Sequence, residues 1–158
     1  MIGAPPHIAG ELFKARAGVN IVQVGYKGIG GGFADVIAGQ VQLMFPAAGA
    51  VVSHVKSGRL RALAVTSARP SALAPGLPTV ASAGLAGYEA VSNYGLFAPA
   101  KTPAAIVTLL NQEAARVLAS AVTKERFYNA GVETVGSTPE EFIASIKADV
   151  NRWRKVIK

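Results

Sequence analysis

The sequence contains no cysteine, and this absence excludes disulfides, thiolate catalysis and cysteine-based zinc sites. No apolar run approaches the roughly 20 residues that are needed to span a bilayer. Acidic residues are scarce, because nine Asp and Glu stand against sixteen Lys and Arg and leave a formal net charge of +7. Their only close pair, Glu140 and Glu141, falls at the predicted start of a helix, so no pair of catalytic carboxylates is predicted. The excess of positive charge favours an anionic partner.

The basic residues do not follow a nucleic-acid-binding pattern. They occur singly or in pairs, apart from one cluster near the end of the chain at Arg152, Arg154, Lys155 and Lys158. No aromatic residues interleave with them in a stripe. The cluster falls in the last turns of a predicted helix, where the helix dipole favours cations. The charge pattern therefore argues against nucleic acid and leaves a membrane surface or an acidic small molecule open.

The chain is long and apolar enough to fold around a core, since 51% of its 158 residues are hydrophobic. Its first part alternates between strand and helix patterns. A helix opens directly after Pro5 and Pro6, and the remaining elements are strands at 21–24, 42–45 and 60–66 and helices at 31–38 and 48–56. This alternation predicts an α/β fold with a largely parallel sheet.

The second part of the chain is more irregular. Prolines and glycines interrupt residues 68–87 around one short helical stretch at 79–83, which predicts a surface connection. Residues 88–98 read as an extended segment interrupted by Gly95. A helix then starts at Thr102 and Pro103.

The last predicted helix, 138–157, carries the clearest start signal in the sequence. Thr138 is the expected N-cap, and Glu141 three residues later completes a capping box. Its apolar residues recur at spacings of three and four: Phe142, Ile146, Val150, Trp153 and Ile157. One face of this helix must therefore be covered.

A candidate anion site lies in the segment Ile21 to Phe45, IVQVGYKGIGGGFADVIAGQVQLMF, which reads as strand, glycine-rich turn, helix and strand. Four glycines open the turn: Gly28, Gly30, Gly31 and Gly32. The first amides of the following helix point back into such a turn and bind a carboxylate well, with Tyr26 and Lys27 beside them and His7 flanking. The competing interpretation is a tight connection between a strand and a helix without a ligand.

The chemistry-bearing residues match no catalytic or cofactor motif. His7 and Glu11 are four residues apart, which fits a helix-surface pair better than a metal site. His54 follows Ser53, but no GxSxG turn is present. Phe33 stands where the dinucleotide-binding fingerprint needs its third glycine, and no Gly-Lys-Ser or Gly-Lys-Thr closes a phosphate-binding loop. The sequence therefore predicts no metal, no cofactor and no enzymatic activity.

Four runs occur in a fixed order along the chain: HIAGELFKARAGVNIVQVGYKGIGGGFADVIAGQVQLMF, GRLRALAVTSARPSALAPGLPTVASAGLAGYEA, YGLFAPAKTP and VGSTPEEFIASIKADVNRWRKVIK. In this combination they resemble the tripartite tricarboxylate transporter substrate-binding receptors, the Bug or TctC family. The resemblance covers essentially the whole chain. It implies a periplasmic binding protein type II-like α/β architecture with two lobes and a hinge.

The resemblance also implies a division of the chain and a set of partners. Residues 1–90 would form the second, ligand-binding lobe, nearly complete, and residues 91–158 the returning half of the first lobe without its N-terminal half. The ligand would be a small organic anion, such as a di- or tricarboxylate, an amino acid or an aromatic acid. The full-length form would be periplasmic and would meet membrane transporter subunits. We expect the exposed first-lobe face of this chain to drive self-association.

The chain departs from the family pattern in length, in its N-terminus and after the QLMF run. Family members are much longer, and the opening MIGAPPHIAGELF lacks the charged and apolar regions of a signal peptide, so the chain as written is not expected to be exported. Pro46, Ala47 and Ala48 stand where family members commonly carry an acidic or amide residue, so that polar ligand contact would be missing or replaced by backbone amides near Ala47. A second hypothesis stays open, namely a stand-alone α/β module with a different binding or cryptic enzymatic role.

Overall fold

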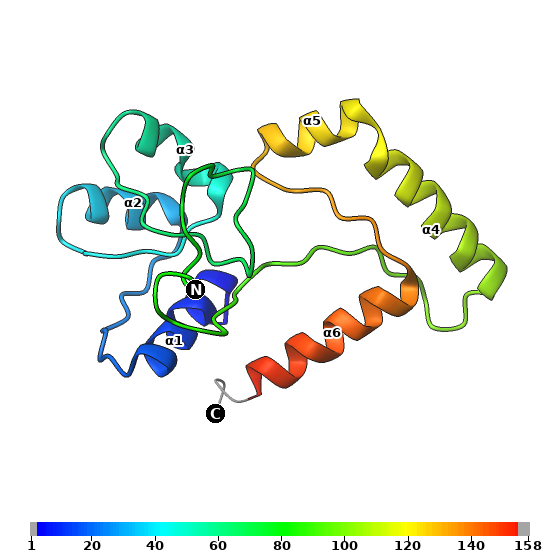
Figure 1. Cartoon of the computed structure of the whole chain (residues 1–158), viewed down its shortest axis with the longest axis horizontal. Helices are drawn as coiled ribbons and strands as arrows, with labels where there is room; N and C mark the ends of the chain where they lie inside the picture. Colours follow the sequence, from blue (N-terminus) through cyan, green and yellow to red (C-terminus); the bar gives the residue numbers. More distant parts are fainter. Residues whose placement is uncertain (1–2, 155–158) are drawn as a thin grey trace. The chain divides into compact units, whose positions relative to one another are not determined.

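The structure, a computed structural model, describes residues 3–154, and the chain divides into two compact units. The first unit is Met1–Ser92 and the second is Asn93–Lys158. The first contains α1 (Pro5–Ala17), α2 (Ile29–Ile37) and α3 (Ala48–Lys56), and the second contains α4 (Ala104–Ala119), α5 (Ala121–Asn129) and α6 (Pro139–Trp153) (Figure 1).

The helices of the first unit begin and end where the sequence places proline and glycine. Proline occupies the first turn of α1, where its missing N–H costs nothing, and Gly18 ends the helix with φ 65°. Gly58, with φ 72°, follows α3. Both glycines adopt the left-handed conformation that other residues avoid at helix ends. The helix predicted at 31–38 begins two residues earlier, at Ile29, with Gly28 as its N-cap.

The core of the first unit lies around α1. Ala9 and Leu12 of α1 are buried, and the Tyr88 side chain, 1% exposed, donates a hydrogen bond of 2.9 Å from its hydroxyl to the Ala9 carbonyl. Phe13 packs against the rings of Phe45 and Tyr88. These contacts hold α1 against chain segments that are far away in sequence.

The strands predicted at 21–24, 42–45 and 60–66 are extended in the structure but form no ladder. Among residues 3–154 the only β-pairing is an isolated parallel bridge between Val65 and Thr79. A ladder requires a neighbour in register, and the end of the third segment bonds instead to the connection that follows it. The segments predicted as strands are therefore non-helical as expected, whereas the described residues show no ladder between them.

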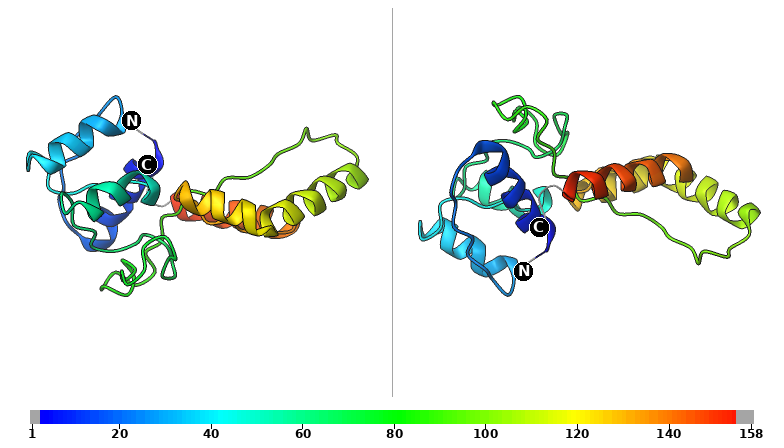
Figure 2. Two further views of the ribbon diagram at one scale, coloured as in Figure 1. Left: turned by 90° about the horizontal axis from the view of Figure 1, so that it is seen from above. Right: turned by 90° about the horizontal axis from the view of Figure 1, so that it is seen from below.

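The connection between residues 67 and 87 is irregular, and Figure 2 shows it in green without helix or strand. The short helix predicted at 79–83 is a turn instead. There the Ser82 amide donates to the Thr79 hydroxyl oxygen at 2.9 Å, and the Thr79 amide donates to the Ser82 hydroxyl oxygen at 3.1 Å. These side chains bond to the backbone in place of helical carbonyls.

The second unit consists of helices joined by extended chain. Ser120 ends α4 and caps α5, a helix that the sequence analysis did not predict. The capping box of α6 is present as predicted, with Thr138 and Glu141 bonding reciprocally to backbone amides. The predicted end of this helix, including Ile157, lies outside the described residues.

Within the second unit, Phe142 of α6 packs onto the extended segment before α4. Its ring centroid is 5.5 Å from that of Phe97, and it occupies the space that a side chain at Gly95 would need. Farther along the same face, Ile146 and Val150 are exposed to 36% and 45%. Across residues 3–154, none of the helices combines the length and the apolar character of a membrane-spanning segment.

Candidate functional site

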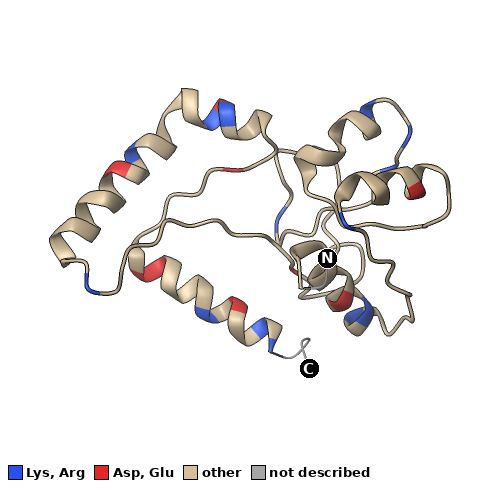
Figure 3. Cartoon of the chain, turned by 180° about the vertical axis from the view of Figure 1, so that it is seen from behind, with Lys and Arg blue, Asp and Glu red and all other residues tan. Residues whose placement is uncertain are grey.

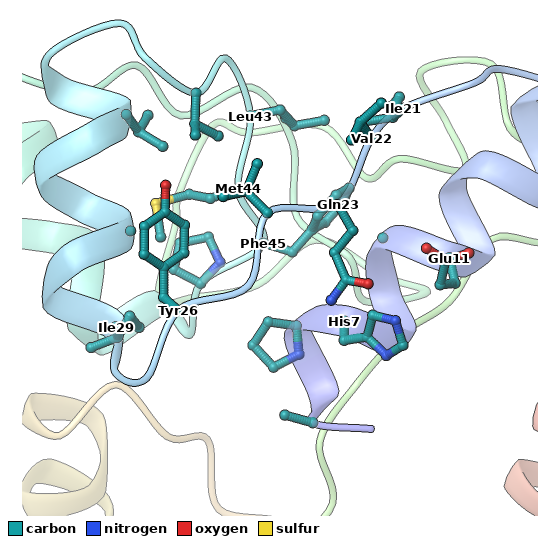
Figure 4. Close-up of a pocket in the computed structure, with 18 of the residues that line it drawn as sticks. His7, Glu11, Ile21, Val22, Gln23, Tyr26, Ile29, Leu43, Met44 and Phe45 are labelled. Carbon is teal, nitrogen blue, oxygen red and sulfur yellow. The ribbon is translucent and has the colours of Figure 1, made fainter. Parts of the chain in front are cut away.

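A pocket of about 320 Å³ lies in the first unit. Its walls come from α1, the extended segment 21–28, α2 and the extended segment 41–46. Figure 4 shows α1 and α2 on either side of it, with Gln23 extending toward the start of α1 where His7 lies. The walls between the two extended segments are mainly aliphatic and aromatic, and the polar groups gather where these segments end.

The N-terminus of α2 opens at the polar end of this pocket. Gly28 caps the helix with extended backbone and makes no side-chain cap hydrogen bond, and the first turn carries no acidic residue. These amides and the helix dipole therefore favour an anion there. Gly28 and Ile29 both line the pocket.

Two side chains complement this end. Lys27 lines the pocket and makes no ion pair in the described part of the chain, so its charge is available to an anion. His7 accepts a hydrogen bond on Nδ1 from the Gly3 amide at 3.1 Å. With Nδ1 bonded to the Gly3 amide, Nε2 is the ring nitrogen that is left to donate to a carboxylate.

The remaining charged groups of the pocket neutralise each other. Lys14 and Glu11 form an ion pair of 3.0 Å along α1. The His7 and Glu11 pair that the spacing placed on one helix face does line one pocket, but Glu11 bonds to Lys14. Within residues 3–154 no group of three or more His, Asp or Glu side chains is placed to hold a metal ion.

Tyr26 forms the wall beside α2. Its hydroxyl donates to Asp35 Oδ2 at 2.6 Å, and this hydrogen bond, followed by desolvation and by the Asp35 charge, raises the pKa of Tyr26 above 10.0. Its ring lies over the first turn of α2, because a Cβ at Gly31 would be 3.2 Å from Tyr26 Cδ1 and one at Gly32 would be 3.6 Å from Cδ2. Two of the glycines therefore make room for an aromatic side chain.

The pocket gathers some of the residues that the sequence analysis selected and omits others. His7, Tyr26, Lys27, Gly28 and Gly32 line it. Gly30, Gly31 and Ala47 do not line it. Ala47 is instead the N-cap of α3.

Sequence reasoning did not select several lining residues, among them Gln23 and Met44. Gln23 was read as part of a strand, and no motif marks it. Strand alternation would not have selected it either, because consecutive residues of this segment, 21–24, all line the pocket.

The sequence also matches a protein family over nearly its whole length. The family described as "Tripartite tricarboxylate transporter family receptor" matches residues 2–158. The chain belongs to this family. This is the same family that the four sequence runs resembled, so the predicted family membership is confirmed.

Two relatives show how much of a family protein the chain represents. It is 34% identical over 157 residues to the UPF0065 protein in the tcbD-tcbE intergenic region of Pseudomonas sp. strain P51, covering 99% of this chain and 47% of that protein. It is also 34% identical to the UPF0065 protein in the clcB-clcD intergenic region of Pseudomonas knackmussii, covering 99% and 93%. The chain thus spans about half the length of the first relative and nearly all of the second.

Two solved structures confirm the fold class. Rpa4515 of R. palustris, solved with adipate, superposes with a TM-score of 0.80 at 36% identity, covering 98% of this chain and 52% of that one. The periplasmic binding protein BugD superposes with a TM-score of 0.72 at 31% identity, covering 98% and 52%. The chain has part of a periplasmic binding protein fold. Both its family and this structural neighbour are described as receptors or binding proteins.

Proposed function

We propose that this chain forms part of a receptor that binds a small organic carboxylate, with the anion held where the extended segments 21–24 and 42–45 end. In α/β folds, ligands bind at the carboxyl ends of the strands. The similarity to Rpa4515, solved with adipate, is the observation that carries the proposal. The start of α2, whose N-cap Gly28 has no side chain to bond its first amides, supplies the matching chemistry together with Lys27 and His7.

The ligand carboxylate accepts from the first amides of α2 and from Lys27, and His7 donates from the other side. The helix dipole contributes about 0.3–1 kcal/mol, and a hydrogen bond to a charged group contributes about 1.5–3 kcal/mol. Several donors are therefore needed for useful affinity. A di- or tricarboxylate, an amino acid and an aromatic acid all carry the carboxylate that these donors require.

The whole receptor works by closing two lobes on its ligand. We assign residues 1–90 to the second lobe and residues 91–158 to the returning half of the first. Ligand shifts the balance between open and closed forms only through its higher affinity for the closed form. In the periplasm, the closed form meets the membrane subunits of a tripartite tricarboxylate transporter. The receptor binds its ligand without chemical conversion.

Calorimetry with adipate tests the anion site on the chain co-expressed with the half of Rpa4515 that it does not match. We expect adipate to bind this completed receptor and to bind the chain alone weakly or not at all. Lys27→Met should weaken binding at least tenfold, because it removes a charged donor. Lys56→Met, at the end of α3 and outside the pocket, is the matched control.

Two results would count against the proposal. Unchanged affinity for adipate in Lys27→Met would show that the carboxylate does not bind at the assigned site. Turnover of the ligand would favour the stand-alone module with a cryptic enzymatic role.

A further inference from the structure

Tyr26 contacts α2 at two places along the helix. Its ring lies over the first turn, at Gly31 and Gly32, and its hydroxyl donates to Asp35 Oδ2 at 2.6 Å. These three helix positions share one face, because residues three or four apart are neighbours on the surface of a helix. Figure 4 shows the Tyr26 side chain lying beside α2. The two glycines therefore leave room for the ring, and Asp35 holds its far end.

The backbone that carries the proposed anion donors lies between two glycines. Gly25 precedes Tyr26, and Lys27 and Gly28 follow it. Apart from the adjacent residues, no heavy atom lies within 4 Å of the place where either glycine would carry a Cβ. Glycine gives the backbone the widest choice of conformations and loses the most entropy when it is ordered. The placement of Lys27 and of the N-cap Gly28 therefore depends on the side chain of Tyr26.

The side chain of Asp35 reaches the pocket only through Tyr26, because Asp35 itself does not line it. It is the one acidic residue of α2 (Figure 3). A negative charge on a helix that binds an anion repels the ligand, so the charge by itself is unfavourable for binding. A hydroxyl that donates to a carboxylate forms one of the stronger kinds of hydrogen bond. The single hydroxyl proton of Tyr26 is thereby used by Asp35 and is not offered to the ligand.

The backbone of Asp35 makes a separate connection at the end of α2. Its carbonyl accepts from the amides of Gln40 at 2.8 Å and Val41 at 3.2 Å, which lead into the extended segment 41–46. A substitution of the side chain leaves both of these backbone groups in place. The role of the carboxylate can therefore be tested without removing the end of the helix.

We propose that Asp35 is a positioning residue for the anion site. Its carboxylate holds the Tyr26 hydroxyl, and Tyr26 in turn holds Lys27 and the first turn of α2 in the places where they bind the ligand carboxylate. This inference rests on the proposed function, because it gives Asp35 and Tyr26 a part in the same site. In this role Tyr26 is a wall and an anchor of the site, and it is not a hydrogen-bond donor to the ligand.

Calorimetry with adipate tests the positioning role on the same completed receptor. Asp35→Leu and Tyr26→Phe should each weaken binding about tenfold or more, because each removes a hydrogen bond to a charged group and leaves Lys27 less well placed. Charge alone predicts tighter binding in Asp35→Leu, since a negative charge is removed from α2. The double variant should lose about as much affinity as either single variant, because both remove the same bond. Tighter binding in Asp35→Leu would overturn the proposal.

A conservative variant and a matched control separate positioning from a general loss of stability. Asp35→Asn keeps an oxygen that accepts from the Tyr26 hydroxyl, so it should bind adipate about fivefold more tightly than Asp35→Leu. Tyr128→Phe makes the same change as Tyr26→Phe in α5, outside the pocket, and should leave the affinity unchanged. Equal losses in Asp35→Asn and Asp35→Leu, or in the two tyrosine variants, would overturn the proposal.

Nuclear magnetic resonance of the completed receptor, recorded before adipate is added, reads the position of the ring directly. An aromatic ring shifts the signals of nuclei that lie against its face. In Asp35→Leu the amide signals of Gly31 and Gly32 should therefore move, because the ring is no longer held over them. Gly30 is the internal control, since a Cβ there would meet nothing within 4 Å. Unmoved signals at Gly31 and Gly32 would show that Asp35 does not hold Tyr26, and the proposal would be wrong.

The Lys27→Met variant separates this inference from the site on which it rests. Weaker binding of adipate in Lys27→Met with unchanged affinity in Asp35→Leu would keep the anion site and overturn the positioning role. Unchanged affinity in both variants would overturn the site itself, and the positioning role with it.

Discussion

Tyr26 shows how a single side chain sets the shape of the candidate site. The residues alone suggested that the glycines of the turn free the backbone for an anion. The structure gives two of them another role, because the Tyr26 ring lies over Gly31 and Gly32 while its hydroxyl is held by Asp35. Gly30, in contrast, has open space where a Cβ would be.

Alanine substitutions at Gly30 and Gly31 distinguish these two roles. Gly30→Ala should raise the free energy of unfolding by about 0.5–1 kcal/mol, because alanine favours the helix and meets nothing. Gly31→Ala should give a smaller gain or a loss, because Tyr26 must move away from a Cβ 3.2 Å from its ring. Urea unfolding followed by circular dichroism measures both, and an equal gain at the two positions would contradict the packing role.

Tyr88 predicts how stability depends on alkaline pH. Burial raises the pKa of Tyr88 from 10.0 to about 12. Since the unfolded chain loses this proton first, the stability contributed by neutral Tyr88 is complete below pH 10 and is lost as pH rises toward 12. We expect the free energy of unfolding to fall across this window more steeply in the native sequence than in Tyr88→Phe. Parallel pH curves for the two proteins would show that Tyr88 ionises as freely in the fold as in solvent.

At the scale of single elements, the start of α6 is set locally. Thr138 and Glu141 satisfy backbone amides that the first turn of a helix leaves without partners. The apolar face of the same helix is not set locally, because among its residues up to Arg154 only Phe142 has a partner ring, at Phe97. Local signals therefore determine where the helix begins, and packing of its apolar face determines how much the helix contributes to stability.

Removing the cap should destabilise the second unit by a modest amount. Thr138→Ala is expected to lower its free energy of unfolding by about 1 kcal/mol, because an N-cap hydrogen bond is lost. Ser137→Ala is the control, since Ser137 contributes only its carbonyl, which accepts from Asn111. Thermal unfolding followed by circular dichroism compares the two variants. An equal loss of stability at both positions would show that the N-cap hydrogen bond is not the cause.

At the scale of the whole molecule, much apolar surface is left uncovered. No residue between 93 and 154 is buried, and α4, α5 and α6 have exposed apolar residues such as Leu109 and Val122. Since burying one large apolar side chain is worth about 1.5–3 kcal/mol, the second unit lacks a main source of stability.

We therefore expect the isolated chain to self-associate or to unfold with poor cooperativity. Light scattering after size exclusion should give a mass that rises with protein concentration, or the melt should be broad. Adding the unmatched half of Rpa4515 should sharpen the transition, because it covers apolar faces. A strictly monomeric chain with a sharp two-state melt would contradict this expectation.

The sequence by itself determined what depends on neighbouring residues. The capping box of α6 was predicted from local geometry, and the structure confirms it. The first helix was predicted directly after Pro5 and Pro6, and the structure begins it at Pro5 itself. Gly18 and Gly58, which follow α1 and α3, end these helices through the same kind of local geometry. The order of characteristic runs also identified the family, because that signal is linear along the chain.

The tertiary structure decided what depends on distant neighbours. The sequence predicted strands at 21–24 and 42–45, but pairing requires a partner edge, and in the described part of the chain both segments line one pocket without pairing to each other. It brought His7, Lys27 and the start of α2 to one end of that pocket, and it placed Tyr26 over two of the turn glycines. Local rules fix the backbone of a segment, whereas its neighbours are fixed only when apolar surfaces from remote parts of the chain are buried together.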